Sequence, residues 1–113
     1  MSCLFCKIIA GELSGQVLYQ DEQVIAFKDI NPKAPHHILI IPRQHIATLN
    51  DVTEDDTYLL GNLMQTAKQL AVELGISEDG YRLVLNCNKF GGQEVYHMHL
   101  HLLGGRQMHW PAG

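Results

Sequence analysis

The stretch His97-Met98-His99-Leu100-His101-Leu102-Leu103 decides the fold of this chain, because its histidines alternate with apolar residues. A period of two predicts a β-strand, since successive side chains of a strand point to opposite faces of a sheet. We expect the three imidazoles to share one face and Met98, Leu100 and Leu102 to enter a core. Neighbouring histidines would lie roughly 6–7 Å apart, from the rise per residue. Such a row of groups that titrate near neutral pH can line a phosphate-sized cleft.

Two other interpretations fit the same face. In the first, the strand is partly solvated and its polar face simply contains histidine. In the second, two histidines at i and i+2 share a zinc ion, which needs a third protein ligand and an open position to be catalytic. The histidine at i+4 lies too far along the strand to join that site easily. Phosphate chemistry and metal chemistry therefore both stay open at this point.

Composition restricts the class of protein. The 113 residues predict one domain over residues 1–113, and 46% hydrophobic with 18% charged residues is typical of a globular domain. A net charge of −4 gives no overall positive field, which argues against nucleic acid as a partner. No apolar run approaches the ~20 residues that span a bilayer, and the stretch from Met1 to Ile9 has no basic leader. We expect a cytoplasmic protein that does not bind membranes.

Hydrophobic periodicity and turn residues predict an α+β fold. We expect a short N-terminal helix over Leu4–Ala10 and a long helix that begins after Thr53 and ends before Gly75. The long helix should bury Leu59, Leu60, Leu63, Met64, Ala67, Leu70, Ala71 and Leu74. The expected strands are Val17–Gln20, Val24–Lys28, His37–Ile41, Tyr81–Asn86 and the histidine stretch. Short turns join most of them, which gives an antiparallel sheet of about five strands.

The loop Gly91-Gly92-Gln93 leads into the histidine stretch. Glycine lets a backbone approach a ligand closely and turn its N–H groups toward an anion. A Gly-Gly pair alone is usually a turn. Beside three histidines on one face, however, it would place an anion cradle next to a nucleophile.

Three segments of the chain resemble a known family. The segment GQEVYHMHLHLLGGR, residues 92–106, resembles the signature of the histidine triad (HIT) superfamily. The ending GGRQMHWP, residues 104–111, is similar to that of the Hint branch, and DINPKAPHHILIIP, residues 29–42, resembles the nucleoside-binding segment of this branch. The resemblance implies a HIT-like fold and a hydrolase that cleaves the P–N bond of adenosine or guanosine 5′-phosphoramidates. A covalent nucleotidyl-histidine would form, and the products would be the nucleoside monophosphate and an amine.

The resemblance also implies roles for four histidines. His99, the middle member of the triad, would be the nucleophile that attacks the α-phosphorus, and a neutral imidazole suits this role. His101 would contact the non-bridging phosphate oxygens, and His97 would lie near the leaving group. His37 matches a fourth active-site histidine, with a structural histidine at a strand start as the alternative.

A nucleotide-binding site around these histidines is implied as well. Asn86 and Gln93 match side chains near the phosphate and the leaving group, and the amides of Glu94 and Val95 would hold phosphate oxygens. Asp29 would accept both ribose hydroxyls. The apolar slot for the purine base would comprise Phe5, Ile8, Phe27, Ile30 and Leu39. Catalysis by this set needs no cofactor.

Cys3-Leu4-Phe5-Cys6 is a Cys-x-x-Cys pair, a spacing typical of metal ligands in a reducing compartment. The resemblance to bacterial histidine triad proteins adds His45 and His97, which would complete a closed Cys₂His₂ zinc site. The alternative is that the two cysteines are free thiols on a helix and bind no metal. A zinc-bound His97 could not also move protons during catalysis.

The C-terminal segment favours a homodimer. Trp110 follows the Gly104-Gly105 break, and a lone exposed tryptophan lowers solubility unless something covers it. Pairing two equal sheet edges would also cover an exposed edge strand. In the Hint branch the tail of one subunit completes the nucleotide site of its partner, which makes Trp110 a candidate binding residue. A tail folded onto its own core is the alternative.

Two other functions stay open from the sequence. The site could belong to a nucleotide-binding interaction or regulatory protein in which catalysis is incidental, or to a dinucleoside polyphosphate hydrolase. The Hint-like ending favours the phosphoramidate hydrolase over the latter. Animal members have serine in place of Glu94 and histidine in place of Lys28, so their preference for the leaving group is not transferred.

Overall fold

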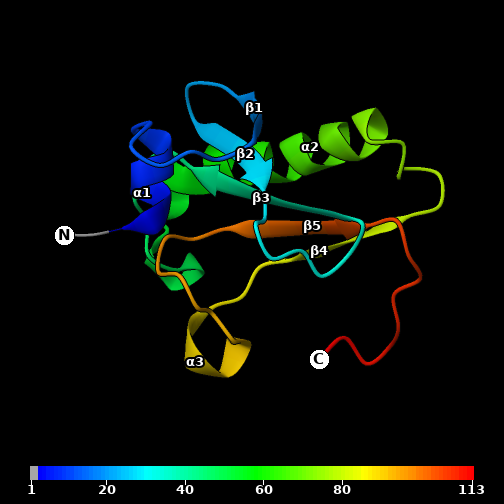
Figure 1. Ribbon diagram of the computed structural model, residues 1–113. Coiled ribbons are helices and arrows are strands. Elements are labelled where there is room, and N and C mark those ends of the chain that lie inside the picture. The colour runs from blue at the N-terminus through cyan, green and yellow to red at the C-terminus, as the bar shows by residue number, and fades with distance from the viewer. Residues whose placement is uncertain (1–2) are drawn as a thin grey trace.

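The computed structural model describes residues 3–113 and contains a five-stranded antiparallel sheet (Figure 1). The strands are β1 (Val17–Gln20), β2 (Val24–Lys28), β3 (His36–Pro42), β4 (Tyr81–Val84) and β5 (Leu100–Gly104). They lie in the order β1-β2-β3-β5-β4, so the last strand in the sequence pairs with β3 on one side and β4 on the other. The expected α+β class is thereby confirmed. Met1 and Ser2, which belong to the N-terminal stretch considered above, lie outside the described residues.

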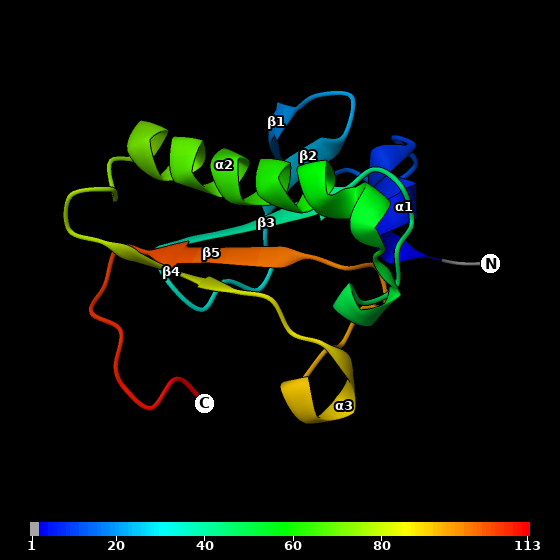
Figure 2. The same ribbon diagram turned by 180° about the vertical axis from the view of Figure 1, so that it is seen from behind.

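The long helix α2 (Thr57–Glu73) covers one face of the sheet, as Figure 2 shows. It begins later than expected, because Thr53 caps a separate 3-10 turn, η2 (Glu54–Asp56), by accepting the N–H of Asp55. Its buried stripe is narrower than expected: Met64 is 52% exposed, since the residues that face the sheet are Leu59, Leu63, Thr66, Ala67, Leu70 and Ala71.

The short helix α1 (Leu4–Ile9) packs on the opposite face of the sheet through Phe5. This face carries a second apolar cluster, made of Phe5, Ile25, Phe27, Leu39 and Ile41. β2 and β3 send alternate residues to the two clusters, so the centre of the sheet is buried on both sides. For this reason both strands are continuous apolar runs in the sequence.

The histidine stretch is only partly a β-strand. β5 begins at Leu100, because the N–H of Met98 donates to the loop carbonyl of Ile46 at 2.7 Å rather than to a neighbouring strand. The predicted alternation nevertheless holds, since Met98, Leu100 and Leu102 all enter the core beneath α2. β4 is also shorter than predicted and ends at Val84.

Short turns that the sequence did not predict complete the fold. They are η1 (Leu49–Asp51), η2 and the one-turn helix α3 (Asn88–Gly91). Gly92, with a φ of +80°, caps the C-terminus of α3. Over residues 3–113, no helix combines the length and the apolar character that a membrane crossing requires.

Candidate active site

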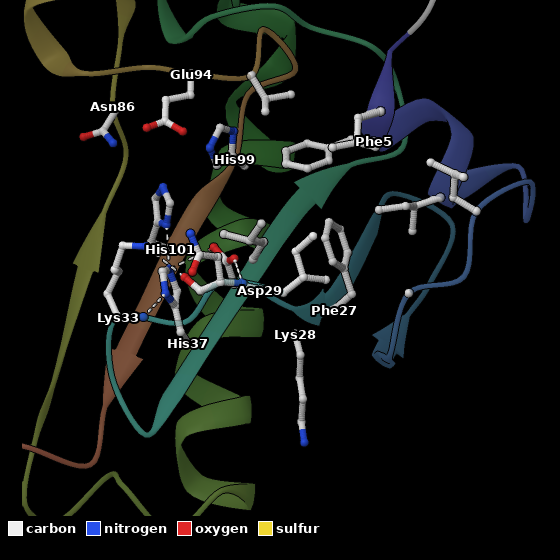
Figure 3. A pocket seen from close by; sticks show the side chains of 18 of the residues that line it. Phe5, Phe27, Lys28, Asp29, Lys33, His37, Asn86, Glu94, His99 and His101 are labelled. Carbon is white, nitrogen blue, oxygen red and sulfur yellow. Dashed lines mark hydrogen bonds and ion pairs between the residues drawn. The ribbon is translucent and has the colours of Figure 1, made fainter.

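A cavity of about 420 Å³ opens beside α1 and the loop between β2 and β3, a volume within the range of small-molecule sites (Figure 3). Most of the residues predicted for the nucleotide site line it: Phe5, Ile8, Phe27, Asp29, Ile30, His37, Leu39, Asn86, Glu94, Val95, His99 and His101. Ile30 is 93% exposed and therefore lies at the rim. In the view of Figure 3, Asn86 and Glu94 lie on one side of His99 and Phe5 lies on the other.

Three predicted residues do not line the cavity: Gln93, His97 and Trp110. The side-chain amide of Gln93 instead connects the loop before His97 to the loop after β3, because it donates to the carbonyls of Val95 and Ala47 at 3.1 and 2.7 Å. Trp110 is 84% exposed, so its side chain is not buried on the core of its own chain.

Several lining residues were not named individually from the sequence: Leu4, Leu13, Ser14 and Gly15, and Asn31 and Lys33 within the segment 29–42. The segment from Leu13 to Gly15 is an irregular connection with no periodic pattern. Its place beside the cavity follows from the packing of α1, which only the folded chain reveals.

His99 presents a free ring nitrogen. Its Nδ1 lies 2.8 Å from the carbonyl oxygen of His97, and since a carbonyl can only accept, Nδ1 carries the proton. The neutral ring therefore keeps its lone pair on Nε2. Burial lowers the pKa of His99, and the hydrogen bond to His97 opposes this shift in part. The edge-to-face ring of Phe5, with centroids 5.1 Å apart, covers the imidazole. The arrangement favours a neutral, nucleophilic imidazole.

His37 and His101 form a hydrogen-bonded pair with a defined proton arrangement. The backbone N–H of Lys33 donates to Nδ1 of His37 at 3.0 Å, so the proton of the neutral His37 ring is on Nε2. That Nε2–H donates to Nδ1 of His101 at 2.9 Å, which places the His101 proton on its own Nε2. Burial, followed by the neighbouring His99 and His37, lowers the pKa of His101 to about 4.

Asp29 lies where β2 ends. Its Oδ1 accepts the N–H of Asn31 at 2.8 Å, and its Oδ2 lies 3.4 Å from Nε2 of His37. The backbone N–H of Asp29 donates to the carbonyl of His37 at 2.9 Å. The carboxylate is thus anchored at the cavity wall, where its oxygens can accept hydroxyl groups of a ligand.

His97 turns away from the cavity toward the two cysteines of α1 and its N-cap. Its Nε2–H donates to the carbonyl of Pro42 at 2.7 Å, which leaves the lone pair of Nδ1 facing Sγ of Cys3 at 3.4 Å and Sγ of Cys6 at 3.5 Å. Nδ1 of His45 lies 3.3 Å from Sγ of Cys6. All four donor atoms lie within 4.8 Å of one another.

The donor set of this Cys-His cluster fits zinc. Tetrahedral zinc binds sulfur at about 2.3 Å and nitrogen at about 2.0–2.1 Å, which separates a sulfur from a nitrogen ligand by roughly 3.6 Å. The sulfur–nitrogen distances of 3.3–3.5 Å are close to this value. The hydrogen bond from His97 to Pro42 is the kind of outer contact that orients a metal-binding imidazole.

The chain is similar to proteins of one family along most of its length. Residues 10–108 match the family model described as HIT domain. The chain is 52% identical over 105 residues to the purine nucleoside phosphoramidase of Escherichia coli (strain K12), covering 93% of this chain and 88% of that protein. A HIT family hydrolase from Legionella pneumophila Philadelphia 1 superposes with a TM-score of 0.97 at 61% identity, covering 99% of this chain and 100% of that one. A histidine triad nucleotide-binding protein from Candida albicans gives a TM-score of 0.83 at 34% identity, covering 99% and 85%.

We predict that His101 titrates near pH 4 in the folded protein, below its ordinary pKa of 6.5. The unfolded chain takes up this proton near pH 6.5 and the folded chain only near pH 4. The free energy of unfolding should therefore be highest above pH 6.5 and should fall as the pH drops from 6.5 toward 4.

An NMR titration of the His101 ring measures the midpoint, and chemical denaturation across the same range measures the stability. His101→Gln should make the stability less dependent on pH. A midpoint near 6.5 would contradict the prediction.

Proposed function

The chain belongs to the HIT domain family, and on that premise we propose that it hydrolyses the P–N bond of purine nucleoside 5′-phosphoramidates. The products are the nucleoside monophosphate and an amine. The observation that carries this proposal is the hydrogen bond from His99 to the carbonyl of His97, which keeps Nε2 unprotonated at the cavity wall. The similarity to a purine nucleoside phosphoramidase supports the choice of substrate.

The reaction proceeds in two displacements at phosphorus. The lone pair on Nε2 of His99 forms a bond to the α-phosphorus, and the electron pair of the P–N bond leaves with the amine, which takes a proton from solvent. Water then attacks the nucleotidyl-histidine, its proton passes to solvent, and the lone pair returns to Nε2. A difficult hydrolysis is thereby divided into two easier steps.

Neighbouring groups stabilise the charge that develops on the phosphate oxygens. The Nε2–H of His101 donates to a non-bridging oxygen, and the backbone amides of Glu94 and Val95 hold the others, with Asn86 beside them. Gln93 keeps this loop in place through its hydrogen bonds to backbone carbonyls. His97 takes no part in proton transfer, because both of its ring nitrogens are engaged outside the cavity.

The rest of the cavity selects the nucleoside. Asp29 accepts the two ribose hydroxyls, and a carboxylate makes the stronger, charge-assisted kind of hydrogen bond. The purine base lies in the apolar slot formed by Phe5, Ile8, Phe27, Ile30 and Leu39.

We expect His99→Ala to lower the kcat for adenosine 5′-phosphoramidate by at least about a thousandfold, because the attacking atom is lost. Binding of AMP, measured by calorimetry, should change little. His36→Ala is the matched control, since His36 precedes the lining residue His37 in the sequence but does not itself line the cavity. A His99→Ala variant that retains a tenth of the activity would rule out the nucleophile. A wild-type protein that binds AMP without turning over the phosphoramidate would instead be a nucleotide-binding protein.

We also propose that Cys3, Cys6, His45 and His97 hold a structural zinc ion. The support is the mutual approach of two sulfurs and two imidazole nitrogens, with His97 oriented by Pro42. Bound zinc would link α1 to the segments that carry His45 and His97. Both thiols must stay reduced, as they would in the cytoplasm.

Zinc should copurify at about one ion per chain, and replacing Cys3 and Cys6 by serine should remove it and lower the melting temperature, because closed sites add their binding energy to folding. Cys87→Ser is the control, since Cys87 is a free thiol outside the Cys-His cluster. Elemental analysis that finds no zinc in protein purified without chelator would reject the site.

We propose, finally, a homodimer in which the tail of one subunit reaches the nucleotide site of the other. β4 is an edge strand, and Arg82 on it donates to the carbonyl of His109 at 2.9 Å, which holds the tail beside that edge. The exposed Trp110 is the side chain that a partner would cover.

The chain should sediment as a dimer at micromolar concentration. Truncation after Arg106 should change the relative kcat/KM values for different leaving amines more than it changes the melting temperature, because the tail then contributes to the partner's site. A monomer at that concentration, or unchanged amine preference after truncation, would refute the proposal.

A further inference from the structure

The turn after β5 packs tightly against the loop between β2 and β3. Gly105 has a φ of +94°, and a Cβ on it would lie 2.9 Å from Cβ of Pro35, so only glycine permits this approach. The next residue, Arg106, donates from Nε and Nη2 to the carbonyl of Lys33 at 3.2 and 3.0 Å. One guanidinium thus holds one loop carbonyl through two charge-assisted hydrogen bonds.

Hydrogen bonds continue from Lys33 to the histidines of the cavity (Figure 3). The N–H of Lys33 donates to Nδ1 of His37 at 3.0 Å, and Nε2 of His37 contacts Nδ1 of His101 at 2.9 Å. Both polar backbone groups of Lys33 are therefore engaged, one by Arg106 and the other by His37. An exposed arginine outside the cavity is connected in this way to an imidazole inside it.

The proton arrangement of the histidine pair depends on the Lys33 N–H at Nδ1 of His37, supported by Oδ2 of Asp29, which lies 3.4 Å from Nε2 of the same ring. Without this donor, the His37 ring can carry its proton on Nδ1, and its Nε2 then directs a lone pair at Nδ1 of His101. Two acceptors cannot share a hydrogen bond at 2.9 Å, so His101 would have to move its own proton to Nδ1. The Nε2 of His101 would then have no hydrogen to donate into the cavity.

We propose that Arg106 is a positioning residue for the His37–His101 pair. It holds Lys33 where its N–H keeps the proton of His37 on Nε2, and through His37 it keeps the proton of His101 on the nitrogen that is free to face a ligand. The consequence for catalysis rests on the proposed hydrolase function. The tautomer of His37, by contrast, can be measured without turnover.

Long-range ¹H–¹⁵N correlation spectra of the full-length protein, recorded at mildly alkaline pH, report the tautomer directly. The wild type should show His37 protonated on Nε2. In Arg106→Ala we expect a mixture of tautomers and a kcat about tenfold lower, the size of effect that losing such hydrogen bonds produces. KM should change less than kcat. Arg106→Lys, which offers one flexible donor group instead of a fork, should give intermediate values.

Arg43→Ala is the matched control. Arg43 also holds a loop carbonyl, that of Asp21, through its Nε at 2.6 Å, but this loop joins β1 to β2 and does not line the cavity. The substitution should lower the melting temperature without changing the His37 spectrum.

Three results would overturn the inference. They are a wild-type His37 protonated on Nδ1, an Arg106→Ala variant whose His37 spectrum is unchanged whether or not kcat falls, and an Arg43→Ala variant that shifts the His37 tautomer as much as Arg106→Ala does. If the tautomer shifts in Arg106→Ala while the wild type turns over no phosphoramidate, the positioning role is supported and the hydrolase proposal fails.

Discussion

The segment from His97 to His101 has to satisfy two faces of the sheet at once, and the rest of the structure depends on this constraint. Met98 and Leu100 close the core beneath α2, so His99 between them must face the opposite side, where it packs against Phe5 of α1. In this segment an imidazole can form a hydrogen bond with the backbone carbonyl two residues before it, as His99 does with His97. The ring orientation and the tautomer of His99 are therefore determined by the same packing that builds the core.

Local pattern was sufficient to predict much of this fold. β1 and β2 have the expected bounds, and the positive φ of Gly75 ends the long helix region as anticipated, because these features depend on neighbours in the sequence. The histidine strand and β4 were predicted too long. Their ends depend on partners distant in the sequence, such as the contact from Met98 to the Ile46 carbonyl. The hydrophobic periodicity of a segment does not identify a partner that is distant in the sequence.

The cavity, too, could be predicted from the sequence only in part. Side chains with distinctive chemistry, such as Asp29 and the histidines, could be proposed from the sequence, whereas the backbone hydrogen bonds that fix the protons of the histidines could not. The Lys33 N–H is an example, because any residue except proline could supply it. The conflict noted for His97, between metal ligand and proton carrier, is a question of orientation: its ring faces the cysteines and lies outside the cavity, which is why we propose only the metal role.

The strand order has a consequence for how the protein is made. β5 inserts between β3 and β4, so His101 lies opposite Leu39 and Val84 only after the last strand has left the ribosome. Until then β4 has no partner in the sheet, and the imidazole of His37 lacks its later hydrogen-bond partner, His101. Pairing between such distant segments is slow compared with local structure formation. A nascent chain thus stays without a formed cavity until β5 is synthesised, and the exposed edge of β3 is the surface that a chaperone would meet during that interval.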